Sequence, residues 1–355
     1  MPRTLVRVEV TRIFGLDLMR AVAISLVICS HFLKGVDLLG VFGVELFFVL
    51  SGFLIGGILL RTVETKGGFG FIDLREFLRR RWYRTLPNYY LFLIIYTVVQ
   101  AAAYSHRLPS IGWFARYAVF LQNFAWPNPN WMFGHSWSLC VEEWFYLLTS
   151  GILFLTSRLF SPSRNGRAWA LGMTFGTVLI VPAVLRFALQ PFYGDVRMIT
   201  VFRLDAISLG ILMAVMRSHM PGAWNRFAAL LCLGVASMAL AVFISGWSGS
   251  TTATSLTLMP LGCALLIPAC CRLPQPVNIL RHGVVNLSIW SYSLYLCHPL
   301  IYIGLASVFG YNMFSQNGKL LFKLFTLVVV VCISALNFRF FEKKMTDLRE
   351  RAPHS

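Results

Sequence analysis

The first long apolar run of the sequence carries two ionisable side chains on one predicted helix face. The stretch from Leu16 to Phe32 contains Arg20 and His31, eleven positions apart. Eleven residues of an α-helix make about three full turns, so both side chains lie on one side, about 16 Å apart along the axis. Ionisable groups are costly in hydrocarbon, and this face is therefore predicted to border a polar cavity.

The two residue types on this face suit different chemistry. An imidazole titrates near neutral pH and can take a proton from a hydroxyl group, whereas a guanidinium group holds phosphate or carboxylate groups. A structural interpretation is also open. A histidine in an apolar helix is more often a hydrogen-bonded packing residue than a catalyst, and Asp17 stands three residues before Arg20 as a candidate ion-pair partner.

Later apolar stretches also carry polar residues at membrane depth. Glu45 lies toward the outer end of the second stretch, where it can share a cavity with His31. Glu142 and Glu143 open the fourth stretch, and because adjacent helical residues point about 100° apart, only one of them is predicted to face a cavity. The sixth and ninth stretches add Arg203, Asp205, Tyr295 and His298.

The composition is that of an all-α polytopic membrane protein. Of the 355 residues, 57% are hydrophobic and only 13% are charged, and the mean hydropathy is +0.69, which excludes an ordinary soluble globule. Ten membrane-spanning helices around a polar cavity are predicted. They cover residues 16–34, 41–60, 86–104, 137–156, 169–189, 199–216, 227–246, 252–270, 285–309 and 320–340.

The positive charge is explained by membrane topology. The net charge is +17, and with ten spans 22 of the 31 Lys and Arg residues fall on the side that also holds both termini. Basic connections face the cytoplasm, so both termini are predicted to be cytoplasmic. Topology thus explains the positive charge, and no nucleic-acid partner is expected. Membrane lipids with anionic headgroups are the expected partners.

Two connections are longer than the topology requires. Residues 75–84 have helical spacing and a cationic face, which predicts a helix along the inner surface. Residues 105–136 are rich in Trp, Phe, Pro and Asn; they either cap a cavity and bind a glycan, or form an interfacial aromatic belt. Residues 1–345 are predicted to form one transmembrane domain and 346–355 a short charged tail. The eight cysteines form no CxxC pair, and no metal site is indicated.

Several motifs, taken together and in order, resemble the acyltransferase-3 family of integral membrane O-acyltransferases. The motifs are Leu16-Asp17-x-x-Arg20 with His31, Gly43 to Leu54, Arg81-x-x-Arg84, Trp137-Ser138-Leu139-x-x-Glu142, Arg203-Leu204-Asp205, and Ser293 to Pro299. Glu45 replaces the usual Asp of the family, and Lys343 follows Glu342 where the family usually has Pro. The resemblance implies a bacterial inner-membrane O-acetyltransferase. Such an enzyme uses cytoplasmic acyl-coenzyme A, and its acceptor is a hydroxyl group of a glycan or other glycosylated molecule.

The resemblance also implies roles for single residues. His31 is the expected general base, and Arg20, Arg81 and Arg84 are expected to hold the phosphates of coenzyme A. Glu142 either orients or charge-balances His31, as a catalytic residue, or pairs with an arginine such as Arg203. The residues expected around the acceptor are Glu45, Trp137, Ser138, Arg203, Asp205, Tyr295 and His298.

Two alternatives stay open at this stage. Transfer can proceed directly or through an acyl-histidine intermediate on His31. A polytopic protein with a polar cavity is also compatible with a transporter or flippase of a glycan or lipid-linked intermediate, in which His31 and Glu45 relay protons. Acetyl is the default acyl group, and the sequence specifies neither the acceptor nor the oligomeric state.

Overall fold

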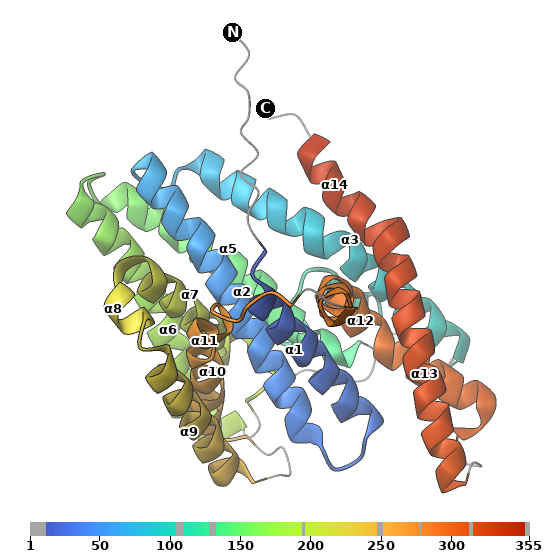
Figure 1. Ribbon diagram of the computed structural model, residues 1–355. Helices are drawn as coiled ribbons and strands as arrows, with labels where there is room; N and C mark the ends of the chain where they lie inside the picture. The colour runs from blue at the N-terminus through green and yellow to red at the C-terminus, as the bar shows by residue number, and fades with distance from the viewer. Residues whose placement is uncertain are drawn as a thin grey trace.

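The computed structural model describes residues 12–103, 110–127, 133–193, 196–246, 251–276, 279–311 and 315–351, and within these ranges it contains helices and turns but no strand. The α-helices, labelled as in Figure 1, are α1 (Phe14–Phe32), α2 (Asp37–Lys66), α3 (Phe71–Ala103), α4 (Ile111–Ala118), α5 (Trp137–Leu159), α6 (Arg164–Tyr193), α7 (Leu204–His219), α8 (Pro221–Trp224), α9 (Phe227–Ser245), α10 (Ser255–Leu265), α11 (Ile267–Cys270), α12 (Ile279–Phe309), α13 (Gln316–Asn337) and α14 (Lys343–Arg351).

Each of the ten predicted spans overlaps a helix. Within the described ranges, seven helical segments are long and apolar enough to cross a membrane. They are Phe14–Phe32, Asp37–Lys66, Gly134–Leu159, Arg164–Tyr193, Phe227–Ser245, Ile279–Phe309 and Gln316–Arg349. The remaining predicted spans, at 86–104, 199–216 and 252–270, correspond to α3, α7 and α10 with α11. The chain is thus a multi-pass, all-helical membrane protein, whereas ten crossings and cytoplasmic termini stay predictions.

Two predicted boundaries fall inside helices. The surface helix expected at 75–84 and the span expected at 86–104 form one continuous helix, α3, which runs through Pro87. A proline removes only one backbone hydrogen bond, and helical residues on both sides continue the helix. The boundary expected at 345 falls within α14, because the chain passes from α13 through a π-helical segment, Phe338–Glu342, directly into α14.

Helix α2 lies at the centre of the bundle, packed against α1 on one side and α7 on the other. Its contact with α7 depends on two glycines. A Cβ atom on Gly52 would lie 1.8 Å from the carbonyl oxygen of Ile207, and one on Gly210 would lie 2.0 Å from that of Val49. No side chain fits in such a space, so these glycines allow the two helices to pack closely.

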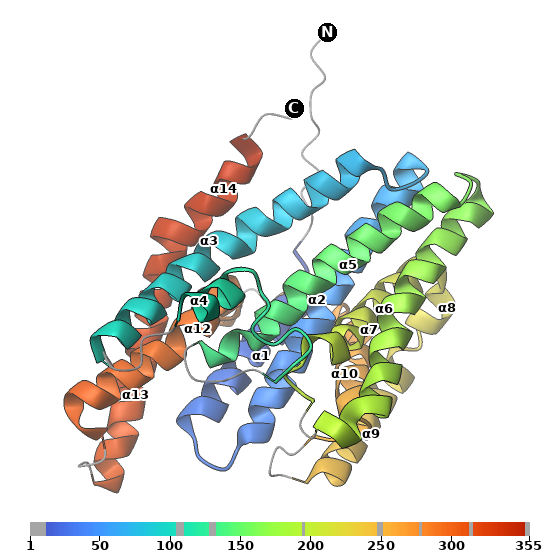
Figure 2. The same cartoon turned by 180° about the vertical axis from the view of Figure 1, so that it is seen from behind.

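The other helices form two groups beside this centre. In Figure 1, helices α6 to α11 lie on one side of α1 and α2, and α3, α12, α13 and α14 lie on the other. Figure 2 shows α5 crossing the face of α2, between the two groups. Helix α4, in the aromatic connection 105–136, is tied to α3 because Tyr89 and Tyr90 donate hydrogen bonds to the carbonyl oxygens of Tyr117 and Ala118, each at 2.8 Å.

Candidate active site

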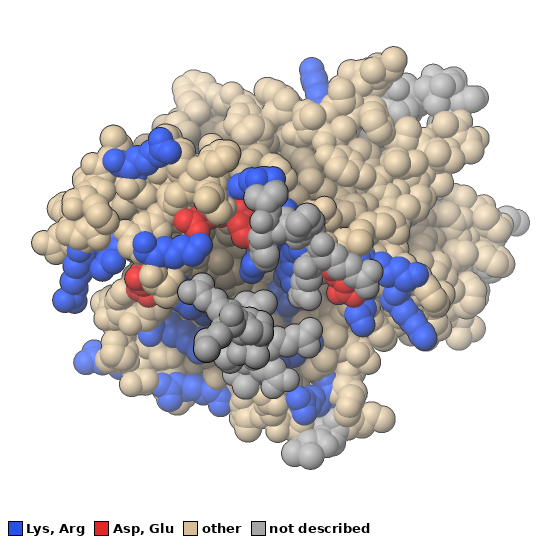
Figure 3. All heavy atoms as spheres, turned by 90° about the horizontal axis from the view of Figure 1, so that it is seen from above, with Lys and Arg blue, Asp and Glu red and all other residues tan. Residues whose placement is uncertain are grey.

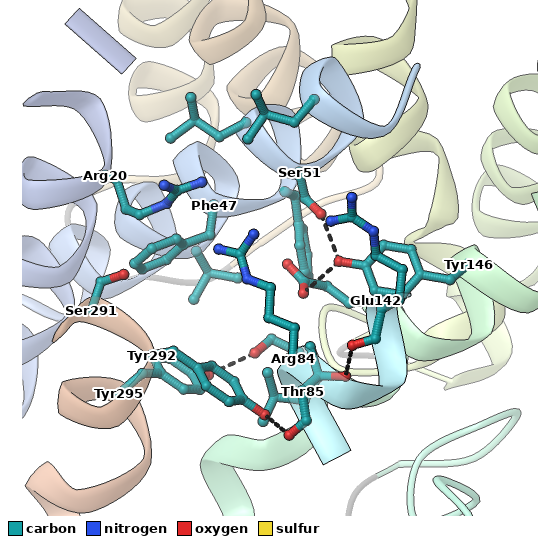
Figure 4. A pocket seen from close by; sticks show the side chains of 17 residues that line it. Arg20, Phe47, Ser51, Arg84, Thr85, Glu142, Tyr146, Ser291, Tyr292 and Tyr295 are labelled. Carbon is teal, nitrogen blue, oxygen red and sulfur yellow. Dashed lines mark hydrogen bonds between the residues drawn. The ribbon is translucent and has the colours of Figure 1, made fainter. Parts of the chain in front are cut away.

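A cavity of about 100 Å³, here called the arginine cavity, lies between α1, α2, α3, α5 and α12. Its polar lining includes Arg20 from α1, Arg81 and Arg84 from α3, and Glu142 from α5. Arg81 and Arg84 are one helical turn apart and therefore share a face of α3. In Figure 4 the guanidinium groups of Arg20 and Arg84 point toward the middle of the cavity. The cavity is therefore suited to a negatively charged or strongly polar ligand.

Glu142 is held in the wall of this cavity by hydrogen bonds. Tyr146 donates from its hydroxyl group to Glu142 at 3.0 Å, and Ser51 lies 2.8 Å from the same hydroxyl group. Glu143 points elsewhere and accepts a hydrogen bond from Thr85 at 2.6 Å. The prediction that only one of the two adjacent carboxylates faces a cavity is confirmed, and that residue is Glu142.

A second and larger cavity, here called the histidine pocket, has a volume of about 380 Å³. His31 and His135 line it, together with Trp137. The histidine pocket and the arginine cavity share two lining residues, Val44 and Tyr295. The two cavities are therefore neighbours, and α1 contributes Arg20 to one and His31 to the other.

The hydrogen bonds of His31 define its tautomer. Its Nδ1 atom lies 2.8 Å from the carbonyl oxygen of Val27, which can only accept, so Nδ1 carries the proton. In the neutral ring Nε2 is then the basic nitrogen. The side chain is exposed in the histidine pocket. This geometry leaves Nε2 as the atom that can take a proton from a ligand.

Two more histidines surround His31. His298 is fully buried, its Nδ1 atom donates to the carbonyl oxygen of Leu294 at 2.9 Å, and its Nε2 atom lies 3.4 Å from Nδ1 of His31. The ring of His135 lies 5.8 Å from that of His298, and its buried Nε2 atom has no hydrogen-bond partner among the described residues. Sequence reasoning did not select His135; its place just before Trp137, at the start of the fourth span, was the available signal.

Tyr295 lines both cavities, and its hydrogen bonds also connect their walls. Ser138 lies 2.7 Å from the Tyr295 hydroxyl group, which in turn donates to the backbone oxygen of His135 at 2.6 Å. Because Tyr295 uses its single proton for His135, Ser138 is the donor in the first contact. This chain fixes the start of α5 against α12 and holds His135 in the pocket wall.

Part of the aromatic connection supports the same wall. The Asn123 side chain donates to the carbonyl oxygens of Trp137, at 3.2 Å, and Met198, at 2.5 Å. Trp137 and Met198 both line the histidine pocket. The described part of the connection thus braces this pocket. Residues 105–109 and 128–132 of the connection lie outside the described ranges, and glycan binding by the connection stays a prediction.

Three of the residues expected around the acceptor lie in buried ion pairs instead of in either cavity. Glu45 pairs with Arg203, and Asp205 pairs with Arg186 at 2.6 Å. Arg203 also donates to the carbonyl oxygen of Leu256 at 3.1 Å. Glu45 therefore does not line the pocket of His31, and the partner of Arg203 is Glu45 and not Glu142.

Asp17 likewise has partners other than Arg20. It accepts hydrogen bonds from Arg12 at 2.9 Å and from Ser288 at 2.7 Å. The structure thus leaves Arg20 in the cavity lining. The predicted site residues separate into four places. Arg20, Arg81, Arg84, Glu142 and Ser138 line the arginine cavity, His31 and Trp137 line the histidine pocket, Tyr295 lines both, His298 lies behind His31, and Glu45, Arg203 and Asp205 form ion pairs.

Comparison with known proteins agrees with the resemblance. The sequence profile of the acyltransferase 3 family, described as an acyltransferase domain, matches residues 13–338. The chain is 30% identical over 159 residues to peptidoglycan O-acetyltransferase OatA of Listeria monocytogenes, which covers 40% of this chain and 24% of that protein. It is 31% identical over 196 residues to YrhL of Bacillus subtilis, provisionally named a peptidoglycan O-acetyltransferase, with 51% and 29% covered.

A third relative is a Staphylococcus aureus protein provisionally named an O-acetyltransferase. It is 29% identical over 213 residues, which cover 56% of this chain and 34% of that protein. The matched region thus spans about a quarter to a third of the length of these relatives. No solved structure matches the chain significantly. Because the family profile covers most of its residues, the protein belongs to the acyltransferase 3 family.

Proposed function

We propose that this protein transfers an acyl group, acetyl in the simplest case, from coenzyme A to a hydroxyl group of a carbohydrate acceptor, with His31 as the general base. One observation carries the proposal. Arg20 and His31 stand on one helix, and they line two cavities that share Val44 and Tyr295. A donor held by its phosphates on the arginine side can therefore present its thioester toward the histidine side.

The donor side rests on the chemistry of the arginine cavity. Guanidinium groups form forked hydrogen bonds with phosphate oxygens, and three of them, from Arg20, Arg81 and Arg84, line this cavity beside a single carboxylate, Glu142. The Nε atom of Arg81 is buried and lacks a hydrogen-bond partner among the described residues. A buried donor without a partner is costly, so an anionic ligand at this point supplies what the protein leaves unpaired.

The transfer step follows from the tautomer of His31. Its Nε2 atom takes the proton of the acceptor hydroxyl group as that oxygen attacks the thioester carbonyl carbon. The new carbon–oxygen bond forms, the carbon–sulfur bond breaks, and the departing thiolate of coenzyme A receives the proton from His31. The ester product and free coenzyme A balance the reaction.

His298 supports this step as a positioning residue. While His31 carries the extra proton it is a cation, and its Nδ1–H group faces both the Val27 carbonyl oxygen and Nε2 of His298. Two acceptors on this side orient the ring and stabilise its charge, which is the role that a carboxylate has in a catalytic triad. His298 is fully buried, and this argues against direct contact with the acceptor.

Glu142 fits a role on the donor side. It lines the arginine cavity and is absent from the lining of the histidine pocket. A carboxylate among three guanidinium groups limits their mutual repulsion, and so keeps the cavity stable without a ligand. We therefore assign Glu142 to charge balance of the arginines, and the acid–base role to His31.

The acceptor is proposed to occupy the histidine pocket. Trp137 and Tyr295 line this pocket and offer aromatic faces, which pack against the apolar faces of sugar rings. The names of two relatives specify peptidoglycan as their substrate. A peptidoglycan-like glycan is accordingly the first acceptor to test.

The experiment uses the purified chain in proteoliposomes with labelled acetyl-coenzyme A and a soluble glycan fragment. The wild type is expected to produce an acetylated, base-labile glycan ester. His31→Ala is expected to lose this activity, while His282→Ala, which removes an exposed histidine of α12, keeps it. Equal activity of the wild type and His31→Ala would refute the assignment of the base.

The structure does not favour the alternative function, transport of a glycan or lipid-linked intermediate. A proton relay through Glu45 and His31 requires the two residues to share a path. Glu45 is instead fully buried against Arg203 and lines neither cavity. Acyl transfer is the function that this arrangement supports best.

A further inference from the structure

A third cavity, here called the basic pocket, lies where α2 ends and α3 begins. It has a volume of about 380 Å³, and α14 contributes one residue to its lining. Four cationic side chains line it: Lys66 from α2, Arg80 and Arg81 from α3, and Arg349 from α14. In Figures 1 and 2 these parts of α2, α3 and α14 lie at the same end of the molecule. Figure 3, which looks onto that end, shows Lys and Arg side chains gathered around a recess.

The three cavities follow one another along α2. The histidine pocket uses residues 37–44 of this helix, the arginine cavity uses residues 44–54, and the basic pocket uses residues 58–66. Neighbouring cavities share lining residues, because Arg81 belongs to both the basic pocket and the arginine cavity. At 1.5 Å per residue, the series from residue 37 to residue 66 is about 44 Å long.

The volumes of the three cavities alternate along this series. The basic pocket and the histidine pocket are each about 380 Å³, and the arginine cavity between them is about 100 Å³. Coenzyme A has a bulky nucleotide head and a slender pantetheine arm that ends in the thioester. A large, then small, then large series suits the adenosine 3′-phosphate, the diphosphate with the pantetheine arm, and an acceptor, in that order.

Two of the four cationic side chains in the basic pocket pair with the two carboxylates of its lining. Lys66 pairs with Asp73, and Arg80 pairs with Glu76 at 2.5 Å. Desolvation acts to raise the pKa of Glu76, but hydrogen bonds from Arg80 and Arg79 outweigh it and the pKa is lowered, so this carboxylate stays ionised. The pocket thus has four cationic and two acidic side chains in its lining, a surplus of positive charge.

Two phenylalanines and the Arg81 side chain form the rest of the binding surface in this pocket. Phe69 and Phe77 are buried and contribute flat apolar walls, against which a purine base can pack. The Arg81 guanidinium group lies 5.9 Å from the centre of the Phe77 ring. The buried Nε atom of Arg81, which lacks a hydrogen-bond partner among the described residues, stands at the junction with the arginine cavity.

We propose that the basic pocket binds the adenosine 3′-phosphate part of coenzyme A, with Lys66, Arg80 and Arg349 around its 3′-phosphate and Arg81 at the passage to the 5′-diphosphate, which the arginine cavity holds. The inference rests on the proposed function only for the identity of the donor. It assigns α14 a part in ligand binding, since Arg349 is its contribution to the pocket.

Binding of the head alone tests the pocket without any reaction. Adenosine 3′,5′-bisphosphate is titrated by calorimetry into the purified chain in phosphatidylcholine nanodiscs. Arg349→Ala is expected to weaken binding roughly tenfold, as the loss of one charge-assisted hydrogen bond predicts. Lys344→Ala removes an exposed cation from the same helix and is expected to leave binding unchanged. A second variant, Lys66→Gln, should weaken binding in the same direction, which guards against a folding defect of one variant.

Two donors then link the pocket to the reaction. Arg349→Ala should raise KM for acetyl-coenzyme A roughly tenfold, and leave KM for S-acetylpantetheine, which has no nucleotide head, at the wild-type value. A wild type that binds the bisphosphate through Arg349 but transfers no acetyl group would refute the proposed function and keep this inference.

Three results would overturn the inference. One is no binding of the bisphosphate by the wild type. Another is equal binding by Arg349→Ala and Lys344→Ala, including the case where acetyl transfer is intact. The third is binding of phosphatidylglycerol that depends on Arg349 in nanodiscs containing this lipid, without bisphosphate binding, which would make the pocket a lipid headgroup site.

Discussion

Two regions inside the bundle hold charged side chains, and they differ in how far opposite charges within the protein balance their arginines. Between α2, α6 and α7, two arginines meet two carboxylates, Arg203 with Glu45 and Arg186 with Asp205. All four side chains are almost completely buried. Arg186 binds both carboxylate oxygens of Asp205, at 2.8 and 2.6 Å. In this region each charge has an opposite charge within the protein.

Between α1, α3 and α5 the balance differs. Arg20, Arg81 and Arg84 face a cavity that offers them one carboxylate, Glu142. Charges at membrane depth persist only when they are paired or face a polar space. The first region therefore holds helices together, and the second is suited to an anionic ligand. Buried arginines in one protein can therefore have unrelated functions, depending on the groups that face them.

The largest effect is expected in the histidine pocket beside the second region, on His31. His31→Ala removes the proposed base, and a positioned general base contributes about 10²- to 10⁴-fold to a rate. We expect kcat to fall by that amount in the acetyl-transfer assay. Binding of coenzyme A, measured by calorimetry, should stay near the wild-type value, because His31 lies in the histidine pocket. Lost binding with preserved kcat would reverse the roles assigned to the two cavities.

The next largest effect is expected in the first region, on stability. Arg203→Ala leaves Glu45 buried without its partner, and breaking a buried pair costs about 3–5 kcal/mol. We expect a lower thermal unfolding midpoint in detergent. The double variant Glu45→Gln/Arg203→Met removes both charges and should recover part of the loss. A stable Arg203→Ala variant with a raised KM for the acceptor would instead support the acceptor role that the sequence indicated for Arg203.

The sequence predicted much of this comparison. Periodicity placed Arg20 and His31 on one face, and the rule for adjacent helical residues predicted that only one of Glu142 and Glu143 enters a cavity. These inferences depend on a single helix, whose geometry is known in advance. Apolar run lengths likewise located a helix for each predicted span.

The pairing of charges between helices could not be predicted in the same way. Glu45 was expected beside His31 because both lie toward the outer ends of their spans, but the rotation of α2 directs Glu45 toward Arg203. Such rotations are set by packing, here by the close contact at Gly52 and Gly210. Two other features could not be predicted for the same reason, because they depend on contacts between distant segments. These are the position of α14 beside α3 and the cluster of His31, His135 and His298.

A smaller effect is expected from the arginine cavity. Arg84→Ala removes one of three cations that surround Glu142, and we expect KM for acetyl-coenzyme A to rise roughly tenfold, as for one charge-assisted hydrogen bond, with kcat close to the wild-type value. Unlike Arg203→Ala, it should hardly change the unfolding midpoint, because it leaves no carboxylate without a cation. A large loss of stability would show that this region is also a scaffold.

The smallest effect is expected from a change of His298, which tests whether this residue helps to position His31. Its Nε2 atom is 3.4 Å from Nδ1 of His31, a long contact beside the 2.8 Å bond to Val27. A neutral hydrogen bond contributes about 0.5–1.5 kcal/mol, so His298→Ala should lower kcat about two- to tenfold and leave KM for the acceptor unchanged. His298→Gln keeps an acceptor oxygen at similar reach and should restore part of kcat. If His298→Ala changes KM and kcat stays constant, His298 contacts the acceptor directly, as the sequence indicated. If both stay constant, the orientation of His31 depends on Val27 alone, and the basic nitrogen in the pocket is then positioned by its own helix.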